Sequence, residues 1–104
     1  MEISFINSKL QKTCEDHSKL KAKYGALQAQ RIIRRINELQ AAANLYDITQ
    51  LPQARLHPLL GDRKGQFAVD IVHPQRIILI PLNGDVADLK TVTIVEINAI
   101  LDYH

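Results

Sequence analysis

The chain lacks several features that are diagnostic of particular classes of protein. It has 104 residues with one cysteine, Cys14, no tryptophan and only 5% aromatic residues. A lone cysteine cannot form a disulfide within the chain, which argues against a disulfide-stapled secreted domain. The four histidines and Cys14 show none of the ligand spacings of a zinc site, and no glycine-rich loop of the nucleotide-binding kind occurs.

A strong charge of one sign and long apolar runs are also missing. The 13 basic and 11 acidic residues give a formal net charge of +2, too small a bias to indicate nucleic-acid binding by itself. No apolar run approaches the length of a membrane span, and the N-terminus lacks the pattern of a secretory signal. The sequence therefore predicts a cytoplasmic protein that does not enter a membrane.

What is present is the composition of a folded domain. Hydrophobic residues make up 46% of the chain and charged residues 23%, which are values typical of globular proteins. The length is that of one domain, so residues 1–104 are predicted to form a single domain with a modest core.

The first half of the sequence predicts a strand followed by two helices. Residues 2–6 alternate polar and apolar side chains as strands do, and Asn7 is a helix start signal. Residues 9–23 are predicted to be helical, and Gly25 separates them from a second helix over residues 26–43. That helix has apolar residues spaced by three and four, namely Ala29, Ile32, Ile33, Ile36, Leu39 and Ala43. We expect the two helices to pack as a hairpin.

The second half predicts short strands joined by turns. Strands are expected near residues 55–59, 67–72, 76–80 and 91–97, with turn chemistry at residues 61–65, at His73-Pro74 and at Asn83-Gly84. The Asn-Gly pair is a signal of a tight hairpin. The predicted fold class is α+β, with an N-terminal strand and a two-helix hairpin packed on a mostly antiparallel β-sheet.

Two stretches carry polar groups that a core would not need. The first joins Arg55-Leu56-His57-Pro58 to the loop Gly61-Asp62-Arg63-Lys64-Gly65, and the second is the terminal Asp102-Tyr103-His104. Hairpin-linked strands bring distant segments side by side, so we expect these stretches to meet. Arg76 is a further candidate, because an arginine in an apolar strand usually has a partner or a ligand.

The run from Arg55 to Gly65, then Arg76-Ile77, then the terminal Asp-Tyr-His, resembles the HigB killer-protein family of the RelE/ParE toxin superfamily. The resemblance covers nearly the whole chain in size, element order and motif position. It implies a RelE-like fold and the toxin of a type II toxin–antitoxin system. Such toxins bind the ribosomal A site and cleave mRNA there as endoribonucleases, using the RNA's own 2′-hydroxyl as nucleophile and no metal or cofactor.

The same resemblance implies the partners. These are the ribosome and its mRNA, and a cognate helix-turn-helix antitoxin of the HigA-like kind that neutralises the toxin. Operator DNA would be reached through the antitoxin alone, and no membrane is involved.

The reaction explains the residue types. The 2′-hydroxyl must lose a proton, the 5′-oxygen must gain one, and the growing negative charge calls for a fixed cation. His57 and His104 are expected to transfer the protons in either order, with Asp102 assisting and Tyr103 positioning the base. Phosphate and RNA contacts are assigned to four cations: Arg55, Arg63, Lys64 and Arg76.

Three departures from the family keep alternatives open. Leu60 stands where many members have a lysine, Gln75 where many have an aromatic residue, and the segment from Asp85 to Ala99 is longer than usual. One alternative is a ParE-like toxin that poisons DNA gyrase. The other is a catalytically decayed toxin that acts only as an antitoxin-binding co-repressor.

The remaining basic residues and histidines have plainer interpretations. Arg31, Arg34 and Arg35 are predicted to form a solvated helix face, with contact to ribosomal RNA or the antitoxin as the alternative. His17 and His73 are expected to be structural or exposed.

Overall fold

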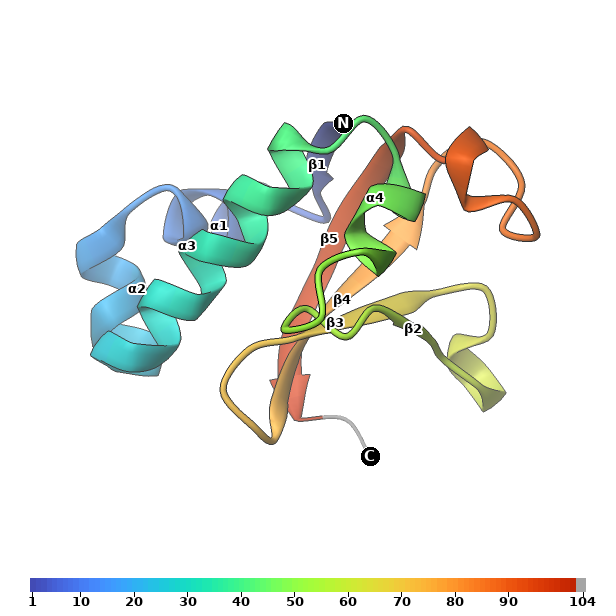
Figure 1. Ribbon diagram of the computed structural model, residues 1–104. Helices are drawn as coiled ribbons and strands as arrows, with labels where there is room; N and C mark the ends of the chain where they lie inside the picture. The colour runs from blue at the N-terminus through green and yellow to red at the C-terminus, as the bar shows by residue number, and fades with distance from the viewer. Residues whose placement is uncertain (103–104) are drawn as a thin grey trace.

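A computed structural model describes residues 1–102, and Figure 1 shows how their helices and strands are arranged. The helices are α1 (Ser8–Cys14), α2 (His17–Tyr24), α3 (Ala26–Ala41) and α4 (Leu45–Thr49). The strands are β1 (Glu2–Phe5), β2 (His57–Pro58), β3 (Phe67–Asp70), β4 (Gln75–Pro81) and β5 (Ile94–Asp102). Two short 3₁₀ turns, η1 (Gly61–Arg63) and η2 (Leu89–Thr91), lie in the loops.

The strands form one mixed sheet in the order β1-β5-β4-β3-β2. Strand β1 pairs in parallel with β5, and the other neighbours are antiparallel. The parallel pair joins the first strand to the last, so helices α1–α4 and three strands lie between them in sequence. The α+β class, the N-terminal strand and the mostly antiparallel sheet are confirmed.

The predicted helix over residues 9–23 is two helices instead of one. Helix α1 ends at Cys14, and Asp16 starts α2 by accepting a hydrogen bond from the Lys19 N–H at 3.2 Å. An aspartate that caps a new helix interrupts the old one, since its own backbone is extended. Gly25, at a φ of 85°, ends α2 and begins α3, so the predicted hairpin is formed by α2 and α3.

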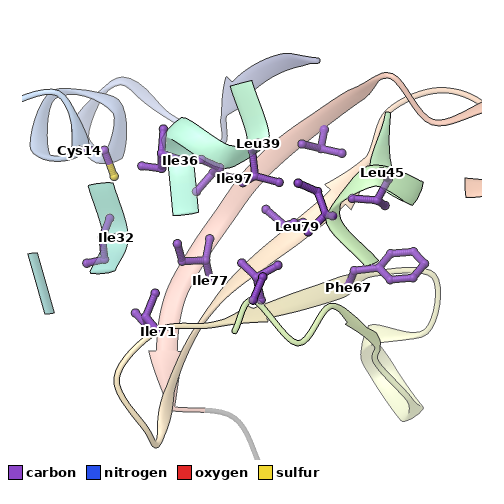
Figure 2. Packing of buried hydrophobic residues seen from close by; sticks show 14 of the residues in the cluster. Cys14, Ile32, Ile36, Leu39, Leu45, Phe67, Ile71, Ile77, Leu79 and Ile97 are labelled. Carbon is purple, nitrogen blue, oxygen red and sulfur yellow. The ribbon is translucent and has the colours of Figure 1, made fainter. Parts of the chain in front are cut away.

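The main core lies between the helices and one face of the sheet, as Figure 2 shows. Helix α3 contributes Ile32, Ile36 and Leu39, which repeat at the helical spacing expected from the sequence. Helix α4 contributes Leu45 to the same core. The buried residues that the sheet contributes from β3, β4 and β5 include Phe67, Val69, Ile77, Leu79, Val95 and Ile97.

The expected tight hairpin at Asn83-Gly84 is not formed. Strands β4 and β5 are joined by residues 82–93, and β5 begins at Ile94. The Asn83 side chain accepts hydrogen bonds from the backbone N–H groups of Thr93 and Ile94, at 2.9 and 3.0 Å. These contacts close a wider loop around η2, which explains why the turn signal did not produce a two-residue turn.

The Cα radius of gyration is 12.8 Å, the size expected of a compact chain of this length. Among residues 1–102, no helix is both long enough and apolar enough to span a bilayer.

Candidate functional site

The centre of the candidate site is a carboxylate held between two arginines. Asp70 and Arg76 are paired in register across β3 and β4, and Arg76 Nε lies 3.0 Å from Asp70 Oδ1. Arg55, in the loop before β2, reaches the other oxygen at 3.3 Å. The side chains of Asp70 and Arg76 are 18% and 17% exposed, whereas that of Arg55 is 68% exposed. Arg55 is therefore the more available of the two cations.

This cluster lies on the sheet face that carries no helix-facing core residues. Ala68 and Ile78 are fully buried in a second small cluster with Leu59, and Ala99 and Leu101 pack against it. Residues paired across strands share a face, and alternate residues share it along a strand. Asp70 and Arg76 therefore lie on the face of Ala68 and Ile78, opposite the helices.

His57 lies on the same face. It is paired with Ala68 across β2 and β3, and Ala68 lies two residues before Asp70 on the same face of β3. Its Nδ1 lies 2.6 Å from the backbone oxygen of Arg55. Because a carbonyl oxygen accepts hydrogen bonds, this contact assigns the proton of the neutral ring to Nδ1. Nε2 is then the nitrogen that can accept a proton from a ligand.

Arg55 has a strained backbone. Its φ is 45°, the one positive value at a non-glycine residue among residues 1–102. The left-handed region costs a non-glycine residue roughly 1–2 kcal/mol. This backbone turn directs the Arg55 carbonyl to His57 and its guanidinium to Asp70, so one residue positions both groups.

The structure does not bring Arg63 and Lys64 to this cluster. They lie at the tip of the β2–β3 hairpin, beyond the Pro58–Phe67 pair, whereas Asp70 is at the opposite end of β3. Arg63 donates to the Gln66 side chain at 3.0 Å within its own loop, and Lys64 is exposed. These two cations form a separate basic loop on the same hairpin.

The end of β5 does lie beside the cluster. Arg76 is paired with Leu101, and Gln75 with Asp102. Because side chains alternate along a strand, Leu101 and Asp102 point to opposite faces, and Leu101 shares the face of Arg76. Tyr103 and His104 lie outside the described residues. The backbone of the C-terminal stretch thus approaches the cluster as far as residue 102, as expected, but the Asp102 side chain lies on the face opposite to His57, so the structure does not bring it into the cluster.

The sequence pattern gave the wrong environment for Arg35. It was predicted to lie on a solvated helix face, but its side chain is 2% exposed. Its guanidinium donates to the backbone oxygens of Asp70 and Gln53, at 2.8 and 2.9 Å, and pairs with Glu38 at 2.9 Å. Arg35 lies three residues after Ile32 and four before Leu39, so the helical spacing itself could have indicated an inward position.

Two residues that hold the cluster in place, Asp70 and Arg35, were therefore not predicted from the sequence. Asp70 falls within the strand predicted near residues 67–72 and has no role among the predicted site residues, although it holds both Arg55 and Arg76. Arg35 fixes the backbone of Asp70 from the helix side, because its Nε bonds the Asp70 carbonyl. The candidate cluster on one face is therefore anchored by a buried cation from the helix side.

The arrangement suits an anionic ligand more than a metal ion. Among the described residues, no group of three His, Cys, Asp or Glu side chains gathers in a way that could hold a metal. The cluster offers an exposed guanidinium at Arg55, a forked donor at Arg76 and a proton acceptor at His57 Nε2. Guanidinium forks match phosphate geometry, and histidine moves protons near neutral pH.

Comparisons with known proteins add no relative. The chain matches no known protein-family model, and no curated protein matches it. Membership of the HigB family remains a prediction from the residues.

Proposed function

We propose that this chain is the toxin of a type II toxin–antitoxin system, a ribosome-dependent endoribonuclease that cleaves mRNA in the A site. The observation that carries the proposal is the cluster of His57, Arg55, Asp70 and Arg76 on the sheet face that the helices leave free. It brings together a proton acceptor and two cations, which are two of the three kinds of group that RNA cleavage requires, the third being a general acid.

In the proposed reaction, Nε2 of neutral His57 takes the proton of the RNA 2′-hydroxyl. The resulting oxygen attacks the neighbouring phosphorus, and the bond to the 5′-oxygen breaks. An acid returns a proton to that leaving oxygen, and His104 is proposed for this role. The products are a 2′,3′-cyclic phosphate and a free 5′-hydroxyl, so atoms and charges balance without a metal or cofactor.

Arg55 and Arg76 would stabilise the extra negative charge on the phosphorus centre. Arg55 is mostly exposed, so it would meet the phosphate first, while Arg76 is held in place by Asp70. Tyr103 is proposed to stack on a base. Arg63 and Lys64, at the hairpin tip, would contact the RNA backbone farther from the scissile bond.

The proposed function also implies a cellular target and a protein partner. Ribosomes with their mRNA would be the target in the cytoplasm, and a helix-turn-helix antitoxin would neutralise the toxin. That antitoxin would connect the complex to operator DNA.

The test is induction in bacteria followed by mapping of mRNA ends, with wild type beside His57→Ala. The matched control is His17→Ala, an exposed histidine at the start of α2 on the helix side of the molecule. We expect growth arrest with new internal mRNA cuts for wild type and for the control. Both effects should be lost in His57→Ala.

Other outcomes would favour the two alternatives. Growth arrest without mRNA cuts, accompanied by gyrase-linked DNA breaks, would replace the proposal by the ParE-like one. No arrest from stably folded wild-type protein would indicate a decayed toxin that acts as co-repressor.

A further inference from the structure

The outer edge of β5, past the point where β1 ends, is a second surface of interest that is separate from the His57 cluster. Strand β1 pairs with β5 from Glu2↔Ile94 to Phe5↔Ile97 and ends there. Strand β5 continues to Asp102 along β4. Within residues 1–102, no strand therefore covers the outer edge of β5 from Asn98 to Leu101.

The backbone groups that face this edge follow from the pairing. Ile6 N–H donates to the Ile97 carbonyl at 3.0 Å, so Ile97 faces β1, and Leu82 N–H donates to the Ile94 carbonyl on the other side. A register shift at Ile78/Leu79 places Ile77 opposite Ile100. Because hydrogen-bonded and non-hydrogen-bonded pairs alternate in an antiparallel ladder, Ile100 directs its N–H and C=O outward.

A hollow of about 250 Å³ adjoins this edge, between β5, the end of β1, α1 and the end of α2. Ile100 and Asn98 form part of its wall, and Ile6, Leu10 and Tyr24 add apolar side chains to a lining that also includes polar residues. Ile6 is 48% exposed, so its side chain is accessible to a ligand in the hollow. An enclosed cavity of about 150 Å³ holds a benzene ring, so this hollow has room for a large apolar side chain.

The charge of the hollow selects its occupant. Its described lining includes Lys9 and Lys23, both exposed, and no aspartate or glutamate. An unpaired strand edge binds an extended backbone, a hollow with apolar side chains in its wall accepts an apolar side chain, and two lysines attract carboxylates. These three requirements together describe one kind of ligand.

We propose that the β5 edge from Asn98 to Leu101 and the adjoining hollow bind an extended acidic and apolar peptide segment of a protein partner. The segment adds a strand in line with β1 and pairs with the backbone of Ile100. It places an apolar side chain against Ile6, Leu10 and Tyr24 and carboxylates beside Lys9 and Lys23. This surface lies outside the His57 cluster, so the proposal stands or falls separately from RNA cleavage.

The test uses the whole chain and a defined set of acetylated, amidated hexapeptides that alternate Asp or Glu with Val, Leu or Phe. Binding is followed by NMR, with the amide shift and hydrogen exchange of Ile100 as the local readout. We expect at least one peptide to bind with protection of the Ile100 amide. Methylating the peptide nitrogen that pairs with β5 should weaken binding about tenfold, since it removes a backbone hydrogen bond.

Matched lysine variants test the charge requirement. Lys9→Ala and Lys23→Ala should each weaken peptide binding by about threefold, as expected for exposed ion pairs. Lys19→Ala and Lys21→Ala remove exposed lysines outside the described lining and should leave binding unchanged.

Three outcomes would overturn the proposal. The first is that no peptide of the set binds at millimolar concentration to the folded chain. The second is binding that survives methylation at every peptide nitrogen, because strand addition cannot then be the mode. The third is a six-nucleotide RNA that shifts the Ile100 amide at lower concentration than any peptide, which would make the hollow a nucleic-acid site.

Discussion

Asp70 and Arg76 face each other across β3 and β4, with Arg76 Nε 3.0 Å from Asp70 Oδ1, on the sheet face that the helices leave free. The same carboxylate holds Arg55 at 3.3 Å, and its backbone oxygen accepts from Arg35. One aspartate thus occupies two cations that are proposed to bind phosphate. Under the proposed function, Asp70 would therefore compete with the phosphate for Arg55 and Arg76.

Replacing Asp70 by asparagine should lower the stability of the protein while it strengthens RNA binding. Asp70→Asn weakens two ion pairs, and we expect the free energy of unfolding to fall by about 1–2 kcal/mol in urea denaturation. Without the competing carboxylate, the exposed Arg55 should bind a 2′-deoxy RNA oligonucleotide more tightly, with a steeper dependence on salt. Asp62→Asn, in the exposed η1 turn, is the control. Unchanged or weaker RNA binding by folded Asp70→Asn would show that the carboxylate does not compete.

The two neighbouring arginines of α3 should differ sharply in stability. Arg35 is 2% exposed and holds two backbone carbonyls and Glu38, whereas Arg34 is exposed. Arg35→Met keeps the aliphatic stem and removes the guanidinium, which should lower the free energy of unfolding by about 3 kcal/mol. Arg34→Ala should stay within about 0.5 kcal/mol of wild type. Urea midpoints measure both, and equal losses would contradict the buried position of Arg35.

Arg55→Gly should lose activity while keeping stability. Glycine adopts the φ of 45° without strain, which offsets the loss of a largely exposed ion pair. We expect the free energy of unfolding to change by less than about 1 kcal/mol. Under the proposed function, mRNA cleavage in a translation extract should fall by about a hundredfold, as for loss of one charge-stabilising donor. Cleavage at the wild-type rate would remove Arg55 from the site.

Cys14 should make stability depend on alkaline pH. Burial raises the pKa of the Cys14 thiol from 9.0 to about 11, and the nearby Lys23 charge opposes this only in part. The unfolded thiol ionises above pH 9 while the folded one stays neutral. Its contribution is therefore complete below pH 9, falls as pH rises from 9 to 11, and levels off above 11.

The full effect is about 3 kcal/mol, because a pKa difference of one corresponds to about 1.4 kcal/mol. The measurement is the difference in urea stability between wild type and Cys14→Ala at several pH values, which cancels the titration of the lysines. A difference that stays constant from pH 8 to pH 11 would show that the native thiol ionises as readily as the unfolded one.

The elements of the fold were largely predictable because their signals are local. Asn7 caps α1, Gly25 separates α2 from α3, and the spacing of Ile32, Ile36 and Leu39 defines the buried face of α3. The break at Asp16 and the wide loop after Asn83 were missed. In both places a side chain bonds a nearby backbone N–H, and this competes with the simpler pattern.

The candidate site was predictable in part. His57, Arg55 and Arg76 were singled out from the sequence, and the structure gathers them around Asp70. Arg63 and Lys64 were expected beside them, but the hairpin carries them to its opposite end. Their sequence distance from His57 is small, so only the direction of the β2–β3 pairing could separate them.

The sequence by itself determined the fold class and the residue types available for chemistry, because helical and strand periodicity are properties of neighbouring residues. Tertiary structure alone decided that β1 pairs with the last strand, that Arg35 is buried, and that Asp70 holds two arginines. The physical reason is that strand register and burial depend on contacts between residues far apart in the chain. A sheet face acquires its cluster only when distant strands align.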